Sequence, residues 1–85
     1  MNNQIDMPQD LTLSELRTED AAQIETIGGG NAVISRMAAM GFSQGVIVNM
    51  VQNYKKRPVI VSVRDSRIAL ARSVADKVYL RRAEY

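Results

Sequence analysis

The chain has 85 residues, contains neither cysteine nor histidine, and carries 11 basic against 9 acidic side chains. This length suits one small domain with a thin core, so its stability must come from packing and not from disulfides or thiolate-bound metal. Without histidine the chain also lacks the commonest general base and the commonest transition-metal ligand. We therefore expect a protein that is not an enzyme, holds no cofactor and has no dedicated metal site, although weak divalent-ion association stays open.

The charges divide the chain unevenly. Residues 1–30 hold six acids and one base, whereas residues 31–85 hold ten bases and three acids. Such a basic part can steer association with an acidic partner, but a solvated face is the simpler interpretation. Residues 1–10 are polar and aperiodic, which predicts a mobile tail before a single domain over residues 11–85. No apolar run approaches the ~20 residues of a membrane span and no signal peptide is recognisable, so we expect a cytoplasmic protein.

The domain opens with a predicted helical turn and a predicted strand. In LTLSEL, Thr12 and Glu15 have the spacing of a capping box, which predicts one helical turn. In AAQIETI, Ile24 and Ile27 stand three residues apart, so a strand needs a bulge there. A short helix is the alternative, and the β-branched residues with the glycines that follow favour the strand.

The stretch GGGNAVISRMAAMG predicts the main helix. Asn31 is a suitable N-cap after the three glycines, and the apolar residues Val33, Met37 and Met40 recur on one face. Gly41 follows the last of them, where a left-handed residue ends a helix without a Cβ penalty. The glycines could instead bind an anion, but the lysine of a phosphate loop is missing. The methionines could bind copper(I), but core packing is the better interpretation.

The rest of the chain alternates with period two. VIVNMVQNY, VIVSV, RIALA and VYLRR are predicted strands, with a loop at KKRP, a tight turn at RDS and a helical turn capped by Ser73. Five short strands favour a small barrel, which removes exposed sheet edges. The predicted core residues are Val33, Met37, Met40, Val48, Val61, Ile68, Leu70 and Leu80.

The stretches just described, taken together, resemble a known family. LSEL, AQIETIGGG, RMAAMGFSQGVIV and PVIVSVRDSRIALARSVADKVYL occur in the order found in the FeoA family, small cytoplasmic proteins of bacterial ferrous-iron uptake. The resemblance covers residues 11–85. Met37 stands where leucine is usual, and Gln44 where proline is common, so the turn after the helix is less rigid here.

The resemblance implies a mainly β fold, an SH3-like barrel of about five strands with one helix after the first. It also implies an accessory or regulatory role, acting on the cytosolic part of a FeoB-type membrane transporter without inserting into the membrane; self-association stays open. Similar modules form the C-terminal domains of metal-dependent repressors, but this chain has no helix-turn-helix of its own.

Two loops, with Arg36 on the predicted helix, are the expected partner-binding sites, since SH3-like barrels present shallow grooves lined by loop residues. The candidates are Arg36, Gly41, Phe42, Ser43, Gln44, Gly45, Tyr54, Lys55, Lys56 and Arg57. Arg36 can contact a partner or cap the carbonyls of a neighbouring loop, and we favour the cap. The alternative function is nucleic-acid binding by the basic hairpin 54–57, which so few aromatic residues make less favoured.

Overall fold

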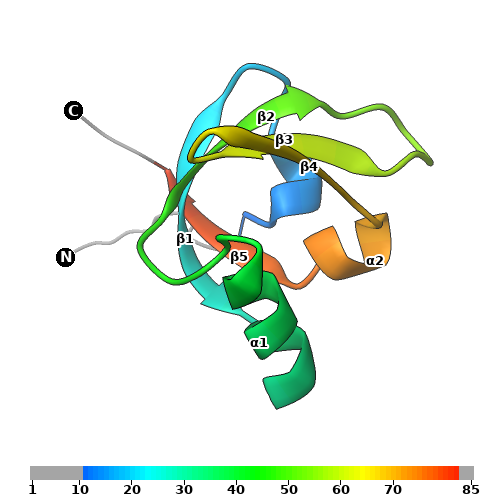
Figure 1. Cartoon of the computed structure of the whole chain (residues 1–85). Coiled ribbons are helices and arrows are strands. Elements are labelled where there is room, and N and C mark those ends of the chain that lie inside the picture. The colour runs from blue at the N-terminus through cyan, green and yellow to red at the C-terminus, as the bar shows by residue number, and fades with distance from the viewer. Residues whose placement is uncertain (1–10, 83–85) are drawn as a thin grey trace, which may run out of the picture.

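A computed structural model describes residues 11–82, so the predicted tail over residues 1–10 lies outside the described residues. Five antiparallel strands form one strongly curved sheet in the order β4-β3-β2-β1-β5, with the main helix projecting from one end (Figure 1). The elements in chain order are η2 (Leu13–Glu15), β1 (Ala21–Ile27), α1 (Asn31–Ala39), β2 (Ile47–Gln52), β3 (Val59–Val63), β4 (Ser66–Leu70), α2 (Arg72–Ala75) and β5 (Val78–Arg82). The predicted mainly β barrel with one helix after the first strand is confirmed.

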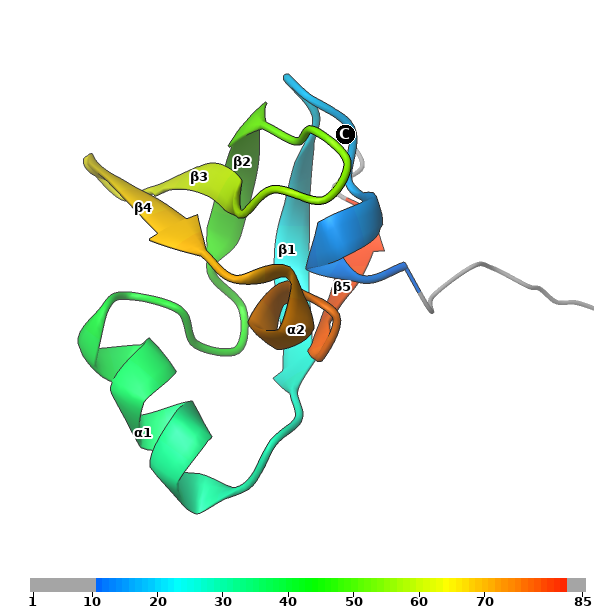
Figure 2. The same cartoon turned by 90° about the vertical axis from the view of Figure 1, so that its right-hand side faces the viewer.

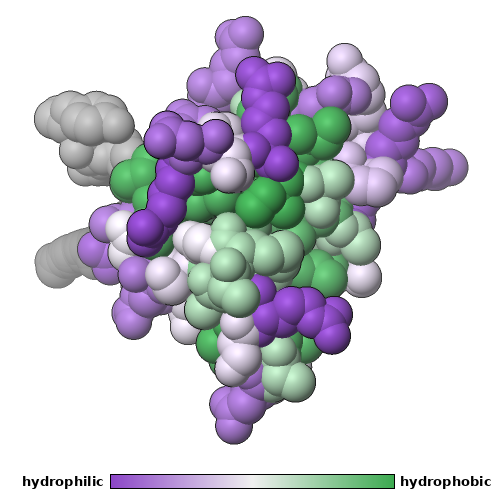
Figure 3. Space-filling view, in the orientation of Figure 1, coloured by the Kyte–Doolittle hydropathy of each residue, from purple (hydrophilic) through white to green (hydrophobic). Residues whose placement is uncertain are grey.

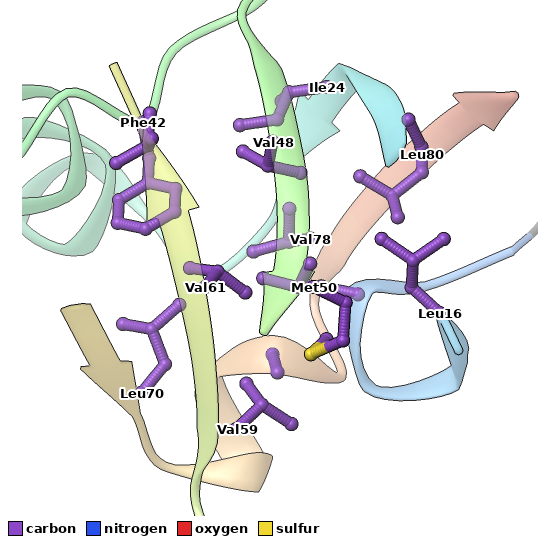
Figure 4. Close-up of a cluster of buried hydrophobic side chains, with 14 of the residues drawn as sticks. Leu16, Ile24, Phe42, Val48, Met50, Val59, Val61, Leu70, Val78 and Leu80 are labelled. Carbon is purple, nitrogen blue, oxygen red and sulfur yellow. The ribbon is translucent and has the colours of Figure 1, made fainter. Parts of the chain in front are cut away.

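The core lies inside the curve of the sheet. Alternate residues of the strands point inward, as period-two patterning requires, and Figure 4 shows several of them converging from different strands. The buried apolar residues are Leu13, Leu16, Ala22, Ile24, Met37, Phe42, Val48, Met50, Val59, Val61, Val63, Leu70, Ala75, Val78 and Leu80. No polar or charged side chain is buried among the described residues, so this small core rests on apolar packing alone.

The predicted turn and bulge at the start of the domain are both present. The Glu15 carboxylate accepts a hydrogen bond from the Thr12 backbone N–H at 2.9 Å, which is the reciprocal half of a capping box. The pairing of β1 with β5 shifts register between Ile24 and Thr26. The bulge inserts one extra residue into β1, as the strand prediction required for two isoleucines that stand three residues apart.

The N-cap of helix α1 lies one residue earlier than predicted. Asn31 is its first helical residue, and Gly30 takes the cap position with φ of 91°. The prediction of Asn31 as N-cap is therefore wrong, because glycine alone among the candidates adopts this backbone without strain. At the other end, the Phe42 N–H donates to the Met37 carbonyl and the Gly41 N–H to the Ala38 carbonyl, both at 2.9 Å. This pair of bonds is a Schellman motif, and it confirms the predicted helix end.

Gly41 has φ of 98°, as predicted. We expect Gly41→Val to lower the free energy of unfolding by about 1–2 kcal/mol, because a residue with a Cβ resists this left-handed geometry. The new Cβ would lie 3.7 Å from a Val63 methyl carbon, an ordinary contact, so the loss comes from the backbone and not from a clash. Urea unfolding measures the change, and Gly41→Asn should cost less. An unchanged midpoint for Gly41→Val would contradict this account.

Five of the eight predicted core residues are buried, and three are only half-buried. Val33, Met40 and Ile68 pack against the edge of the core without being enclosed. The first two belong to the α1 region, which projects from the sheet (Figure 2). Ile68 lies on β4, one of the two edge strands. Periodicity identified their apolar face correctly, but it could not show that little covers this face.

The two edges of the sheet differ. The outer edge of β5 is covered, because the Leu80 N–H donates to the Leu11 carbonyl at 2.8 Å and Thr12 bridges Tyr79. Within residues 11–82 no ladder joins β4 to β5, so the barrel is open there. The expectation that barrel closure removes the sheet edges is therefore wrong for β4. The chain turns away from β4 into α2, which begins at Arg72.

The helical turn predicted around RSVADK is present as α2, but Ser73 is not its cap. Ala71 occupies the N-cap position with an extended backbone, and no side chain caps it. Because the helix starts at Arg72, Ser73 already lies within its first turn, where its hydroxyl cannot serve as the N-cap acceptor.

Candidate protein-docking site

A groove of about 200 Å³ lies between α1 and the end of β1. We call it the helix groove; its lining residues are Glu25, Thr26, Ile27, Ile34, Ala38, Phe42, Ser43 and Gln44. Ile34 is 39% exposed and lines this groove. Green and pale-green atoms reach the lower surface of the molecule in Figure 3, where α1 lies in Figure 1. The helix groove therefore offers a small apolar surface to solvent.

Part of the predicted loop 41–45 builds this groove. Phe42 is fully buried and reaches the groove from the core, whereas Ser43 and Gln44 line it from the loop. The loop is fixed to β1, since the Gly45 N–H donates to the Ile24 carbonyl at 2.8 Å and the Gln23 side-chain amide donates to the Gly45 carbonyl at 3.0 Å. These bonds preorganise the surface that the loop presents to solvent.

Arg36 does not have the structural role that we favoured. It is exposed on α1, and within residues 11–82 its guanidinium makes no hydrogen bond or ion pair. The expected cap of a loop by an arginine exists, but Arg72 provides it. The reason is geometric: α1 projects away from the loops whose carbonyls need a donor, whereas α2 lies beneath one of them (Figure 1).

Arg72 and Asn53 hold the basic loop 54–57 in place. The Arg72 guanidinium donates to the Tyr54 and Arg57 carbonyls, both at 2.7 Å, to the Asn53 side-chain oxygen at 2.6 Å and to the Ser14 carbonyl at 3.2 Å. The Asn53 amide in turn donates to the Ser14 and Leu16 carbonyls. Sequence reasoning missed this network, because it joins three segments that are far apart in the chain.

The charged side chains of this loop face solvent. Lys55, Lys56 and Arg57 are exposed and form no ion pair within the described part of the chain, and Tyr54 is 57% exposed. Their loop projects at the upper right of Figures 1 and 3. The six residues of β2 separate it from loop 41–45, roughly 20 Å at ~3.3 Å per residue. The two predicted sets are thus not brought together into one site.

We expect Arg72→Ala to loosen the basic loop. The variant loses donors to three carbonyls, and hydrogen bonds to a charged donor contribute about 1.5–3 kcal/mol to stability. Hydrogen exchange of the amides of residues 54–57 should therefore accelerate, and the midpoint of urea unfolding should fall. Arg72→Lys should restore only part of the effect, because an ammonium lacks the planar fork that reaches several acceptors. Arg67→Ala, which removes an arginine without such bonds, serves as the control.

The metal-binding prediction depends on donor chemistry. Within residues 11–82 no group of three or more acidic side chains gathers as a metal site, and the chain has no cysteine or histidine. Borderline metals such as Fe²⁺ prefer imidazole and thiolate donors, so we expect no stoichiometric Fe²⁺ site of micromolar affinity, about −8 kcal/mol. Anaerobic titration calorimetry on the isolated protein measures this. Saturable heat at one ion per chain would contradict the prediction.

None of the helices in residues 11–82 combines the length and apolar character needed to cross a bilayer.

A protein of Methanocaldococcus jannaschii with the provisional name Fe(2+) transport protein A is 32% identical over 62 residues, which cover 73% of this chain and 74% of that protein.

Solved structures of FeoA proteins are also similar to this chain. An iron uptake regulatory protein, FeoA, superposes with a TM-score of 0.81 at 26% identity, over 86% of this chain and 97% of that one. The FeoA of Stenotrophomonas maltophilia, solved with zinc and described as an SH3 domain protein, is 32% identical with a TM-score of 0.73, over 84% and 89% of the two chains. A manganese-dependent repressor at 14% identity shares the fold, with a TM-score of 0.79.

The model of the FeoA domain family matches residues 11–82, the same residues that form the barrel, η2 and both helices. This match covers most of the chain, and the FeoA structures named above superpose on it over more than four fifths of its length. The chain therefore belongs to the FeoA family, whose named members are associated with ferrous-iron transport.

Proposed function

We propose that this protein is a cytoplasmic accessory protein of ferrous-iron uptake that regulates a FeoB-type transporter by docking against its cytosolic part. The observation that carries the proposal is the helix groove with its exposed Ile34, next to a loop that the core holds rigid. Family membership supports the iron-transport context. A small apolar groove bordered by polar side chains has the composition of a protein-docking surface, where a partner side chain fills the apolar centre.

The groove has an ionic border that would help to orient a partner. Glu25 lines the groove and pairs with Arg81 on the neighbouring strand at 3.2 Å, and both side chains remain accessible. An exposed pair of this kind contributes little to stability. Its accessible charges are instead available to a docked partner, and such contacts influence orientation and the rate of association more than affinity.

The test compares two exposed isoleucines. Ile34 lies in the groove and Ile47 lies outside it on β2, with exposures of 39% and 42%. Ile34→Gln should weaken binding to the isolated cytosolic domain of the FeoB-type transporter at least tenfold, about 1.4 kcal/mol, whereas Ile47→Gln should leave the dissociation constant unchanged. Calorimetry gives both constants, and NMR of the labelled protein should place the shifts around Ile34 and Gln44. Equal effects of the two variants would contradict docking in this groove.

A second titration, with oligonucleotides, separates the docking function from nucleic-acid binding by the basic loop. Three phosphate contacts from Lys55, Lys56 and Arg57 would give a log–log salt dependence with a slope of about −2 on single strands. Saturable oligonucleotide binding at ~0.15 M salt, where the Debye length is ~8 Å, that disappears in Tyr54→Ala would support nucleic-acid binding instead. We expect no such binding.

A further inference from the structure

On the outer edge of β4, backbone N–H and C=O groups form no hydrogen bonds to another strand among the described residues. Two residues, Arg64 and Asp65, connect β3 to β4, and Val63 pairs with Ser66 directly beside them. In a hairpin of this type the flanking pair exchanges both hydrogen bonds, and the bonding alternates along the strand. Arg67 and Ala69 therefore direct their N–H and C=O groups away from β3, and within residues 11–82 no other segment pairs with them.

A second feature, a groove, lies at the hairpin end of β4. This groove of about 360 Å³ lies between the β3–β4 hairpin, represented by Arg64 and Ser66, and the end of α1, represented by Met40 and Gly41. In Figure 2, β4 is the outermost strand and α1 lies below it. We call the groove and the β4 edge together the edge groove. Exposed sheet edges are sites at which proteins capture extended peptides by strand addition.

The side chains along the edge groove indicate the chemistry of the partner. Arg64 and Arg67 are exposed and unpaired within the described part of the chain, and Asp65 at the hairpin tip is the single acid of this hairpin. On the opposite face of the strand, Ile68 is only half-buried. Side chains of neighbouring strands that lie on one face interact directly. An added strand would therefore place acidic residues beside Arg67 and apolar residues beside Ile68.

We propose that the β4 edge binds an extended segment of a partner protein in which acidic and apolar residues alternate, as a sixth strand of the sheet. The added strand would satisfy the free groups of Arg67 and Ala69 and cover Ile68, where the barrel is open. A second copy of this chain fits less well, because pairing β4 with β4 would bring two sets of Arg64 and Arg67 together. The β4 strand residues Arg67, Ile68 and Ala69 lie outside the lining of the helix groove, although the groove at the hairpin end shares Ala38 and Ser43 with it. Readouts at Arg67 and Ala69 therefore test this proposal independently of transporter docking.

The test uses a peptide of about eight residues, the upper range of a strand, in which glutamate and valine alternate. In the free protein, the amides of Arg67 and Ala69 should exchange rapidly with deuterium, while those of Ile68 and Leu70, bonded to β3, exchange slowly. Saturation with the peptide should slow exchange at Arg67 and Ala69 at least tenfold and leave Ile68 and Leu70 unchanged. Shifts confined to the helix groove would overturn the proposal, as would equal binding of the matching lysine–valine peptide.

Two variants separate the backbone and charge contributions. Ala69→Pro removes the outward N–H without touching a bond to β3, since proline is tolerated on an edge strand, and should weaken the peptide at least tenfold. Arg67→Glu should weaken it several-fold and reduce its salt dependence, whereas Lys56→Glu, the same charge change away from this edge, should have no effect. Unaltered binding in both edge variants, with unfolding midpoints showing that they are folded, would overturn the proposal. So would concentration-dependent protection of Arg67 and Ala69 without peptide, which would identify a second copy as the occupant.

Discussion

Replacing Phe42 with alanine is expected to lower the free energy of unfolding by about 3–5 kcal/mol. Phe42 is the largest fully buried side chain, and it enters the core from the α1 side of the cluster in Figure 4. A domain of this size has a total stability of only ~5–15 kcal/mol, so the variant should melt at a much lower temperature or be partly unfolded. Thermal unfolding followed by circular dichroism measures the loss.

The neighbouring residue supplies the control for Phe42. Ser43→Ala alters the same loop without removing core volume, and surface substitutions of this kind usually change stability by less than ~0.5 kcal/mol. A Phe42→Ala protein as stable as this control would contradict the packing account. Because Phe42 is both a core residue and part of the helix groove, its loss would also reduce partner binding indirectly. Ile34, which is exposed, is therefore the residue that tests docking itself.

Met37→Ala is expected to cost about 2–5 kcal/mol, and Met40→Ala clearly less. Met37 is 2% exposed and is the one fully enclosed residue of α1, whereas Met40 is half-buried. Met37 is therefore the one side chain of α1 that the core encloses, while Val33 and Met40 pack at the edge of the core. In Met37→Ala the helix should lose hydrogen-exchange protection before the sheet does, because little else holds α1 to the barrel.

The two methionines also test the thioether interpretation. A copper(I) site would need accessible sulfur atoms, and the burial of Met37 removes one of them. Equal losses in Met37→Ala and Met40→Ala, measured by urea unfolding, would contradict the packing account, as would a helix that keeps its protection when Met37 is truncated.

The sequence by itself determined the local structure. The bulge in β1, the end of α1 at Gly41, the turn at Thr12 and the inward-facing residues of the strands all follow from spacing, since each depends on residues within a few positions. It also indicated loop 41–45 as a candidate partner-binding site, and the structure places Phe42, Ser43 and Gln44 in the lining of a groove there. The misplaced caps, Asn31 and Ser73, each lie one or two residues from the observed cap, which is the usual range over which helix ends are ambiguous.

Only the tertiary structure decided which apolar and charged residues are shared between distant segments. Periodicity predicted that Val33, Met37 and Met40 share one face of the helix. The tertiary structure shows that only Met37 is enclosed, because α1 projects from the sheet. The residues that neighbour Arg72 in the sequence do not indicate that its guanidinium joins η2, α2 and the basic loop by hydrogen bonds. The open edge of β4 has the same origin. Strand patterns predict which residues face inward. Whether β4 pairs with β5 depends instead on the path of the chain through α2, and local spacing does not encode this long-range property.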